Sequence, residues 1–146
     1  MSVMVEELVT IEQLVELLNV DLTLEYSAGI QYIQHGAVMT GAMYGDIIKE
    51  LKIHATEEFG HAVLLADQIS FLGGVPTVEV GRIKTSCDNV EMLEQDLAGE
   101  IDAIRRYKLR IDQAESLKEY ALAGQLRTIL AMEQEHAMDL MQALGR

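Results

Sequence analysis

The chain has 146 residues, of which 49% are hydrophobic, and a formal net charge of −13. This length and apolar content suffice for one domain with a proper core but not for two ordinary domains, so we predict a single domain over residues 1–146. The negative charge argues against nucleic acid and anionic membrane partners and favours the attraction of cations.

The N-terminal part of the chain predicts two helices. The first seven residues lack the basic flank and apolar stretch of a secretory signal, and no apolar run could span a bilayer, so we expect a cytoplasmic protein. Thr10 and Gln13 have the spacing of a capping box, and apolar residues follow at helical intervals, predicting a helix over about residues 11–35. Gly36 and Gly41 are expected to interrupt it before a second amphipathic helix over about residues 42–72.

The following segment, residues 73–86, contains the only proline of the chain and predicts an extended connection. Cys87 is the only cysteine, which excludes an internal disulfide and a cysteine cage within one chain, and we expect an ordinary loop thiol. Asp88 and Glu91 form a second capping-box pattern that predicts a helix from about residue 89. Ser116 and Glu119 form a third, predicting a fourth helix from about residue 117.

An internal repeat relates the two halves of the chain. Sliding the sequence by 75 residues superimposes leucines on leucines, as any two core-facing helices would show, but it also superimposes polar residues, which need another explanation. The polar pairs are Asp21 and Asp96, Glu25 and Glu100, Tyr32 and Tyr107, Glu58 and Glu133, and His61 and His136. The chain therefore contains two helical hairpins of one design.

The spacing within each hairpin places its two glutamates at one height. Glu58 follows Glu25 by 33 residues, Glu133 follows Glu100 by the same interval, and the midpoint of each pair falls in a short turn. Each glutamate is thus roughly 25 Å from its turn at 1.5 Å per helical residue. In the second helix of each hairpin a histidine follows three residues after the glutamate, on the same helix face.

Packing the hairpins together would bring four carboxylates and two imidazoles to one level. Free carboxylates buried together would raise one another's pKa values, whereas two divalent cations would neutralise them. Oxygen-rich ligation with one histidine per metal suits iron or manganese, although zinc would also bind such a site. Solvated surface glutamates with two core histidines are the better interpretation of a single Glu-x-x-His, but two copies at one offset favour a metal centre.

These residues resemble those of the ferritin-like di-iron carboxylate proteins, most closely the bacterioferritins, whose ligand pattern is a known one for helix bundles. The resemblance covers nearly the whole chain. It rests on Leu24–Tyr26, Glu57–Ala62, Phe71–Pro76, Asp96–Glu100 and Glu133–His136. It implies an all-α, ferritin-like four-helix bundle of two hairpins joined by a long crossover, for which the 14 residues from Gly73 to Ser86 could span roughly 46 Å if extended.

The resemblance also implies the roles of the site residues. One iron ion would be bound by Glu25 and His61, the other by Glu100 and His136, and both would be bridged by Glu58 and Glu133. The implied chemistry is that of a ferroxidase, in which two Fe²⁺ ions each give one electron to O₂ or H₂O₂. Tyr32 and Tyr107 lie about two turns beyond their glutamates, so each is predicted to hydrogen-bond a carboxylate, with an ordinary buried tyrosine as the alternative.

The chain departs from the bacterioferritins in two places. They bind haem between subunits through a methionine directly after the bridging glutamate of the second helix, where this chain has Phe59, so haem is not expected there. They also carry a short fifth helix that lines the four-fold axes of a 24-subunit shell, whereas this sequence stops ten residues past His136. We expect no fifth C-terminal helix. The size of the expected homo-oligomer, a dimer, a 12-mer or a 24-mer, stays open.

Two histidines lie outside the repeat. His54, one turn before Glu58 and near Glu57, is expected to be an ordinary exposed or packed histidine, and an auxiliary iron site on an inner surface is the less favoured interpretation. His35 is expected to act at the C-terminal end of the first helix.

The sequence therefore predicts a ferroxidase and iron-storage protein of bacterioferritin type, with two iron ions per chain and with Fe²⁺ and O₂ or H₂O₂ as substrates. Two alternatives remain at this stage. One is a small di-iron or di-manganese oxidase or peroxidase that forms no shell, and the other is a structural bundle whose site holds zinc without redox chemistry.

Overall fold

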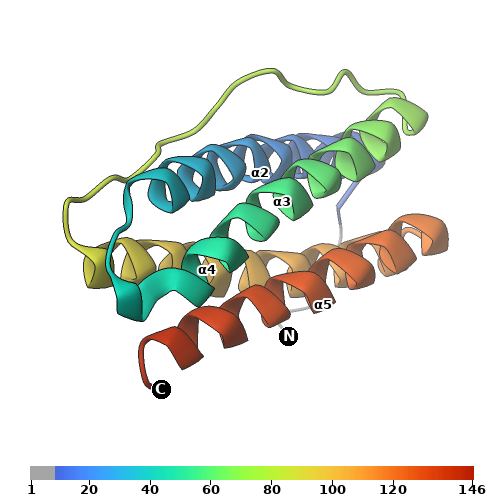
Figure 1. Ribbon diagram of the computed structural model, residues 1–146. Helices are drawn as coiled ribbons and strands as arrows, with labels where there is room; N and C mark the ends of the chain where they lie inside the picture. Colours follow the sequence, from blue (N-terminus) through green and yellow to red (C-terminus); the bar gives the residue numbers. More distant parts are fainter. Residues whose placement is uncertain (1–8) are drawn as a thin grey trace.

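The computed structural model describes residues 9–146, so the first eight residues of the predicted domain lie outside the described part. The described chain has four long helices and one short 3₁₀ helix: α2 (Ile11–Val38), η1 (Ala42–Tyr44), α3 (Gly45–Phe71), α4 (Asn89–Ser116) and α5 (Tyr120–Ala143). They pack as a four-helix bundle (Figure 1). No strand occurs among residues 9–146, and the predicted all-α fold is confirmed.

Two of the three predicted capping patterns start helices. The hydroxyl of Thr10 accepts a hydrogen bond from the backbone N–H of Gln13, whose side-chain oxygen accepts one from the N–H of Thr10, completing the capping box of α2. The carboxylate of Asp88 accepts a hydrogen bond from the N–H of Glu91 and caps α4. The starts of these two helices were therefore predicted correctly.

Two other predicted boundaries are wrong. The first helix continues through Gly36 to Val38, because Gly36 packs closely against α3 and keeps a helical conformation there. Ser116 caps no helix: it is the last residue of α4, and its hydroxyl donates to the carbonyl oxygen of Gln113. A tight turn follows, in which Lys118 has a φ of 61°, and α5 begins only at Tyr120.

The helices form two hairpins, in which α2 packs mainly against α3 and α4 mainly against α5. The connection between the hairpins runs along the length of the bundle, so that α3 and α4 point in the same direction (Figure 1). This is the predicted crossover. Side chains of α2 hydrogen-bond to the backbone of the crossover. The amide of Asn19 donates to the carbonyl of Val75 and accepts from the N–H of Thr77, and the hydroxyl of Ser27 accepts from the N–H of Gly81.

Two apolar clusters fill the bundle, one toward each end. The first contains Leu18, Leu22, Leu65, Leu122 and Ile129 among others, and the second contains Leu51, Leu93 and Leu140. Burial of each such side chain contributes about 1.5–3 kcal/mol. The predicted glutamates, one on each helix, and the predicted histidines of α3 and α5 lie between the two clusters, in a polar layer with apolar packing on both sides.

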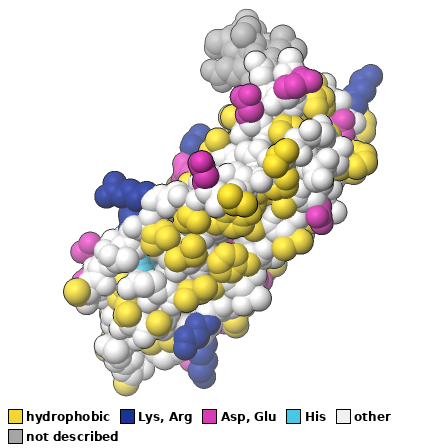
Figure 2. All heavy atoms as spheres, turned by 90° about the horizontal axis from the view of Figure 1, so that it is seen from above, with side chains coloured by type: hydrophobic (Ala, Val, Ile, Leu, Met, Phe, Trp, Pro, Cys, Tyr) yellow, Lys and Arg dark blue, Asp and Glu magenta, His cyan; other side chains and the backbone are white. Residues whose placement is uncertain are grey.

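Part of the apolar surface remains exposed. A band of apolar side chains extends along the face seen from above (Figure 2). Exposed apolar residues of the crossover and of the helices beside it are Val20, Ile33, Phe71, Val75, Val78 and Val80. None of the helices between residues 9 and 146 is long and apolar enough to cross a membrane.

Candidate metal centre

The structure brings the six predicted site residues together in one buried layer. Each helix contributes one glutamate, and α3 and α5 each add a histidine one turn later. They are Glu25 of α2, Glu58 and His61 of α3, Glu100 of α4, and Glu133 and His136 of α5. None of these residues is more than 5% exposed. The equal spacing from each turn, read from the sequence, therefore corresponds to a common height in the bundle.

The donor atoms form two overlapping groups, and within each group they lie within 4.8 Å of one another. One group consists of Glu25, Glu58, His61 and Glu133, and the other of Glu58, Glu100, Glu133 and His136. Glu58 and Glu133 belong to both groups, as two bridging carboxylates would. The other four residues belong to one group each.

The two histidines occupy equivalent positions in this layer. Nδ1 of His61 lies 3.3 Å from Oε1 of Glu58 and 3.5 Å from Oε1 of Glu133. Nδ1 of His136 lies 3.4 Å from each of the same two oxygens. Each imidazole also faces one carboxylate of its own, at 3.6 Å for the glutamate of α2 and 3.1 Å for that of α4.

The polar atoms of this layer fit metal ions. Several buried donor atoms have no hydrogen-bond partner among the described residues, namely Glu25 Oε2, Glu58 Oε1, His61 Nδ1, Glu100 Oε1 and Glu133 Oε1. Buried polar atoms without partners are costly, and a cation between them would satisfy them. Carboxylate oxygens with one imidazole per group suit iron and manganese and also accept zinc.

Burial makes the carboxylates hard to ionise without cations. Burial, followed by the charge of Glu133, raises the pKa of Glu25 to about 7, and the same causes raise the pKa of Glu100 to about 8. Burial and three neighbouring carboxylates raise the pKa of Glu58 well above its ordinary value. Burial would also raise the pKa of Glu133, but its neighbours His136 and Glu58 lower it. The metal-free layer therefore holds protons that cations would displace.

Burial and the neighbouring carboxylates have opposite effects on the pKa values of the two histidines. Burial would lower the pKa of His136, but Glu100 and Glu133 outweigh it and raise the pKa to about 11. Burial would likewise lower the pKa of His61, and the surrounding carboxylates, Glu25 first, raise it. Without metal, protonated imidazoles would partly neutralise the carboxylates; a bound cation requires Nδ1 to be free of its proton.

Two tyrosines connect the hairpins across this layer. The hydroxyl of Tyr32 donates to the carboxylate of Glu100, and the hydroxyl of Tyr107 donates to Oε1 of Glu25 at 2.6 Å. Both tyrosines are fully buried. The predicted hydrogen bonds to carboxylates are therefore present, and each one reaches the glutamate of the other hairpin.

The sequence interpretation missed the partners of Asp21. This fully buried carboxylate accepts hydrogen bonds from Arg106 at 2.6 Å and from Arg110 at 2.7 and 3.1 Å. Both arginines belong to α4, so the ion cluster joins α2 to α4 beside the glutamate layer. The repeat identified Asp21 through its counterpart Asp96 but gave no reason to pair it with arginines.

Asp96 has different partners on the opposite side of the layer. Gln31 donates to Oδ1 at 2.9 Å, and Nδ1 of His35 lies 2.9 Å from Oδ2. Nε2 of His35 lies 3.0 Å from the carbonyl oxygen of Lys84 in the crossover. His35 is in the last turn of α2, as expected, but its ring also joins α2 to α4 and to the crossover, a role that the sequence analysis did not foresee.

The remaining predicted residues are also placed by the structure. His54 is buried, which agrees with a packed histidine, and Cys87 is exposed and free. The ring of Phe59 lies against α2 at Gly29, where an added Cβ would be only 2.8 Å from it. Phe59 has no donor atom for haem iron, which is the reason for expecting no haem at this position. That expectation stays a prediction.

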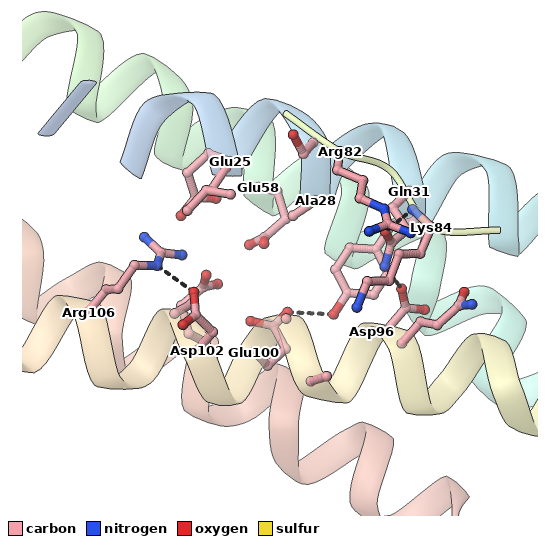
Figure 3. Close-up of a pocket in the computed structure, with 18 residues that line it drawn as sticks. Glu25, Ala28, Gln31, Glu58, Arg82, Lys84, Asp96, Glu100, Asp102 and Arg106 are labelled. Atoms are coloured by element: carbon pink, nitrogen blue, oxygen red, sulfur yellow. Dashed lines mark hydrogen bonds and ion pairs between the residues drawn. The ribbon is translucent and has the colours of Figure 1, made fainter. Parts of the chain in front are cut away.

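A cavity of about 270 Å³ reaches the glutamate layer between α2 and α4. Figure 3 shows Glu25 and Glu58 pointing toward Glu100, with Arg82 and Lys84 of the crossover extending over the opening. A small molecule could approach the carboxylates by this route.

Comparison with known proteins gives consistent matches over almost the entire chain. The ferritin-like domain family matches residues 15–146. A ferritin-like diiron-carboxylate protein from Bacillus anthracis superimposes with a TM-score of 0.88 at 36% identity, covering 92% of this chain and 96% of that one. A dodecameric thioferritin from Bacteroides fragilis, described as bacterioferritin-related, superimposes with a TM-score of 0.87 at 33% identity, covering 99% and 92%.

Sequence comparison alone leads to the same group. The bacterioferritin of Brucella melitensis is 30% identical over 140 residues, which are 91% of this chain and 87% of that protein. The fold, the layer of four glutamates and two histidines, and the family match over residues 15–146 agree with one another. The chain belongs to the ferritin-like family, and bacterioferritins are among its relatives.

Proposed function

We propose that this chain is a bacterioferritin-type ferroxidase and iron-storage protein that binds two iron ions in the glutamate layer. The observation that carries the proposal is the pair of overlapping donor groups that share Glu58 and Glu133. Glu25 and His61 would complete the ligands of one ion. Glu100 and His136 would complete the ligands of the other. Bound iron would supply one-electron redox chemistry at two adjacent positions, which a zinc site would not.

The proposed reaction transfers two electrons and consumes two protons. Two Fe²⁺ ions lose one electron each, and the electrons reduce either one O₂ to H₂O₂ with two protons, or one H₂O₂ to two waters with two protons. Glu25 and Glu100, whose pKa values are raised, would release protons when cations bind. The hydroxyls of Tyr32 and Tyr107 keep these two carboxylates turned toward the layer.

The proposal includes assembly into a homo-oligomer. The apolar side chains exposed along the crossover and the adjoining helices form a band that suits contact with further copies (Figure 2). The related protein from Bacteroides fragilis is dodecameric. A shell around a mineral store would require many copies, whereas a dimer would suffice for an enzyme.

The first test measures Fe²⁺ oxidation in air by the absorbance of the Fe³⁺ formed. We expect the natural protein to oxidise Fe²⁺ faster than buffer alone and the double variant E58Q/E133Q to lose this acceleration, because both bridging carboxylates are removed. E135Q is the control variant, since Glu135 is an exposed glutamate of α5, the helix that also contains Glu133. Oxidation no faster than in buffer would refute the redox function.

The second test measures the mass of the assembly in solution and the iron retained per chain after aerobic loading. Storage predicts retention of many iron atoms by a large assembly. About two atoms per chain in a dimer would instead favour the small oxidase or peroxidase. Binding of zinc without any acceleration of Fe²⁺ oxidation would favour a structural site.

A further inference from the structure

Two cationic side chains of the crossover lie at the mouth of the cavity that reaches the glutamate layer. Arg82 and Lys84 are the only basic residues between positions 72 and 88, and both line this cavity. Figure 3 shows them extending from the crossover over the opening between α2 and α4. Both are exposed, and neither side chain has an ion-pair or hydrogen-bond partner among residues 9–146. Their charges are therefore available to molecules that enter the cavity.

The backbone that carries these two side chains is held against α2. The N–H of Gly81 donates to Oγ of Ser27 at 2.8 Å, and the N–H of Lys84 donates to Oε1 of Gln31 at 2.9 Å. The carbonyl oxygen of Lys84 lies 3.0 Å from Nε2 of His35. The crossover is thus bonded to α2 before and after the segment that extends over the opening. The two cationic side chains start from fixed points, and their charges stay at the entrance.

The third basic residue of the cavity lining is already paired. Arg106 donates to Asp21 at 2.6 Å and to Asp102 at 2.8 Å. At the 75-residue offset the counterpart of Arg106 is Gln31, an amide that binds the backbone of Lys84. Where one half of the bundle has a guanidinium group, the other half therefore has a residue that holds a cationic segment of the crossover in place.

The sign of the charge inside the cavity depends on the metal ions. All four glutamates of the layer line the cavity, and without cations their ionised carboxylates would repel an anion. Two divalent cations would formally neutralise these four carboxylates. The other charged residues of the lining are three basic residues and two aspartates, which leaves a surplus of one positive charge. An anion would therefore be repelled by the empty layer and attracted by the cavity of the loaded one.

We propose that Arg82 and Lys84 make this cavity a route for small anions, which they attract to the glutamate layer once two divalent cations fill it. The inference rests on the proposed function, because only a loaded layer would accept an anion. Clefts lined by one sign of charge raise the arrival rate of ligands with the opposite charge. Neutral O₂ and H₂O₂ would gain nothing from the two cations, whereas an anionic ligand or oxidant would arrive faster and Fe²⁺ would be repelled.

The test measures how fast azide, a small monovalent anion, binds to the Co²⁺-loaded full-length protein. Stopped-flow absorbance of the bound Co²⁺ gives the association rate constant. We expect R82Q/K84Q to lower this constant by about three- to ten-fold at low salt, with a smaller effect on dissociation. The difference from the natural protein should shrink as salt is added, because ions screen exposed charges. Both replaced side chains are exposed, so the fold should be retained.

Two control variants separate charge at the entrance from other effects. K49Q/K108Q removes the same number of charges from two exposed lysines that do not line the cavity, and it should keep the natural rate. R82K/K84R exchanges the two cations without removing a charge, and it should also bind azide at about the natural rate. An effect of side-chain shape or of net charge alone would not give this pattern.

The outcomes for the entrance and for the metal centre can be distinguished. Equilibrium dialysis first checks that the natural protein and R82Q/K84Q take up equal amounts of Co²⁺ and that E58Q/E133Q takes up less. If this holds, an unchanged azide rate in R82Q/K84Q overturns the entrance alone, as does an equal decrease in either control variant. If the natural protein takes up no more Co²⁺ than E58Q/E133Q, the metal centre and the anion route are both refuted.

Discussion

Asp21 and Asp96 occupy equivalent positions in the two hairpins, one turn before the glutamates of α2 and α4, but their environments differ. Asp21 is surrounded by the guanidinium groups of Arg106 and Arg110. Asp96, at the equivalent position of the second hairpin, contacts the side-chain amide of Gln31 and the imidazole of His35 instead. One side of the glutamate layer is therefore closed by two guanidinium charges, and the other by an amide and an imidazole.

The residues of the glutamate layer, in contrast, are the same in the two halves of the chain. Both halves supply the same glutamates, histidines and tyrosines, with nearly equal distances from the histidines to the two shared carboxylates. If the layer binds two equivalent metal ions, as we propose, it needs equal ligands on both sides, whereas an aspartate beside it needs only enough donors to be satisfied. The partners of the two aspartates can therefore differ between the halves although the ligands of the layer do not.

The largest expected effect on stability comes from Asp21→Asn. The substitution leaves two buried arginines with one neutral partner, and it turns an amide N–H₂ toward guanidinium donors. Loss of one partner from a buried ion cluster costs about 3–5 kcal/mol. We expect this decrease in the free energy of unfolding, measured by urea denaturation of the metal-free protein in EDTA.

Asp102→Asn is the control for this prediction. Asp102 also bonds to Arg106, but its side chain is 47% exposed, so its loss should cost under about 1 kcal/mol. If Asp21→Asn were no more destabilising than this control, the arginines would be stabilised by water or by other groups, and the fixed-charge description of this side would be wrong.

A smaller effect is expected from pH on the metal-free protein. Glu25 and Glu100 have pKa values of about 7 and 8 in the folded chain, above their ordinary value of 4.5, so the folded state holds more protons than the unfolded state between these limits. His136 acts in the same direction, because its stabilising effect is complete below pH 6.5 and is lost as the pH rises through its pKa of about 11. The free energy of unfolding should therefore decrease from pH 6 to pH 9, by on the order of 2 kcal/mol.

Thermal unfolding in EDTA across this range measures the effect, which corresponds to a decrease in Tm of about 5 °C. The same titration with Co²⁺ bound is the control. Cations replace the protons in the layer, so the metal-bound protein should have a nearly constant Tm from pH 7 to pH 9. A metal-free Tm that rises with pH would contradict the proposed distribution of protons in the layer.

The repeat in the sequence explains why the position of the glutamate layer could be predicted. Two copies of Glu-x-x-His, each with a glutamate 33 residues earlier, restrict the helix pairing and the height of the site at once. The only proline predicted an extended connection, and the resemblance to ferritin-like proteins implied that this connection is a crossover. Identical residues in both halves identified the glutamate layer, and the structure places these residues together.

The interactions that were not predicted lack such identity. Gln31 corresponds to Arg106, and His35 to Arg110, so the offset that identified the ligands gave no signal for these pairs. The wrong start of α5 has a local cause, since the hydroxyl of Ser116 bonds within α4 rather than capping the next helix. Contacts formed by unlike residues across helices depend on packing geometry, which spacing along the chain does not reveal.

The smallest effect is expected from Asp96→Asn, the counterpart of the first substitution. An asparagine at this position could still accept the hydrogen bond from Gln31 through its oxygen. Its N–H₂ could donate to Nδ1 of His35, while Nε2–H of the same ring donates to the carbonyl of Lys84. All donors and acceptors would be satisfied without a net charge, so the free energy of unfolding should decrease by about 1 kcal/mol or less. A loss as large as that of Asp21→Asn, in the same urea experiment, would mean that this side also needs the charge of its carboxylate and that the two sides are electrostatically alike.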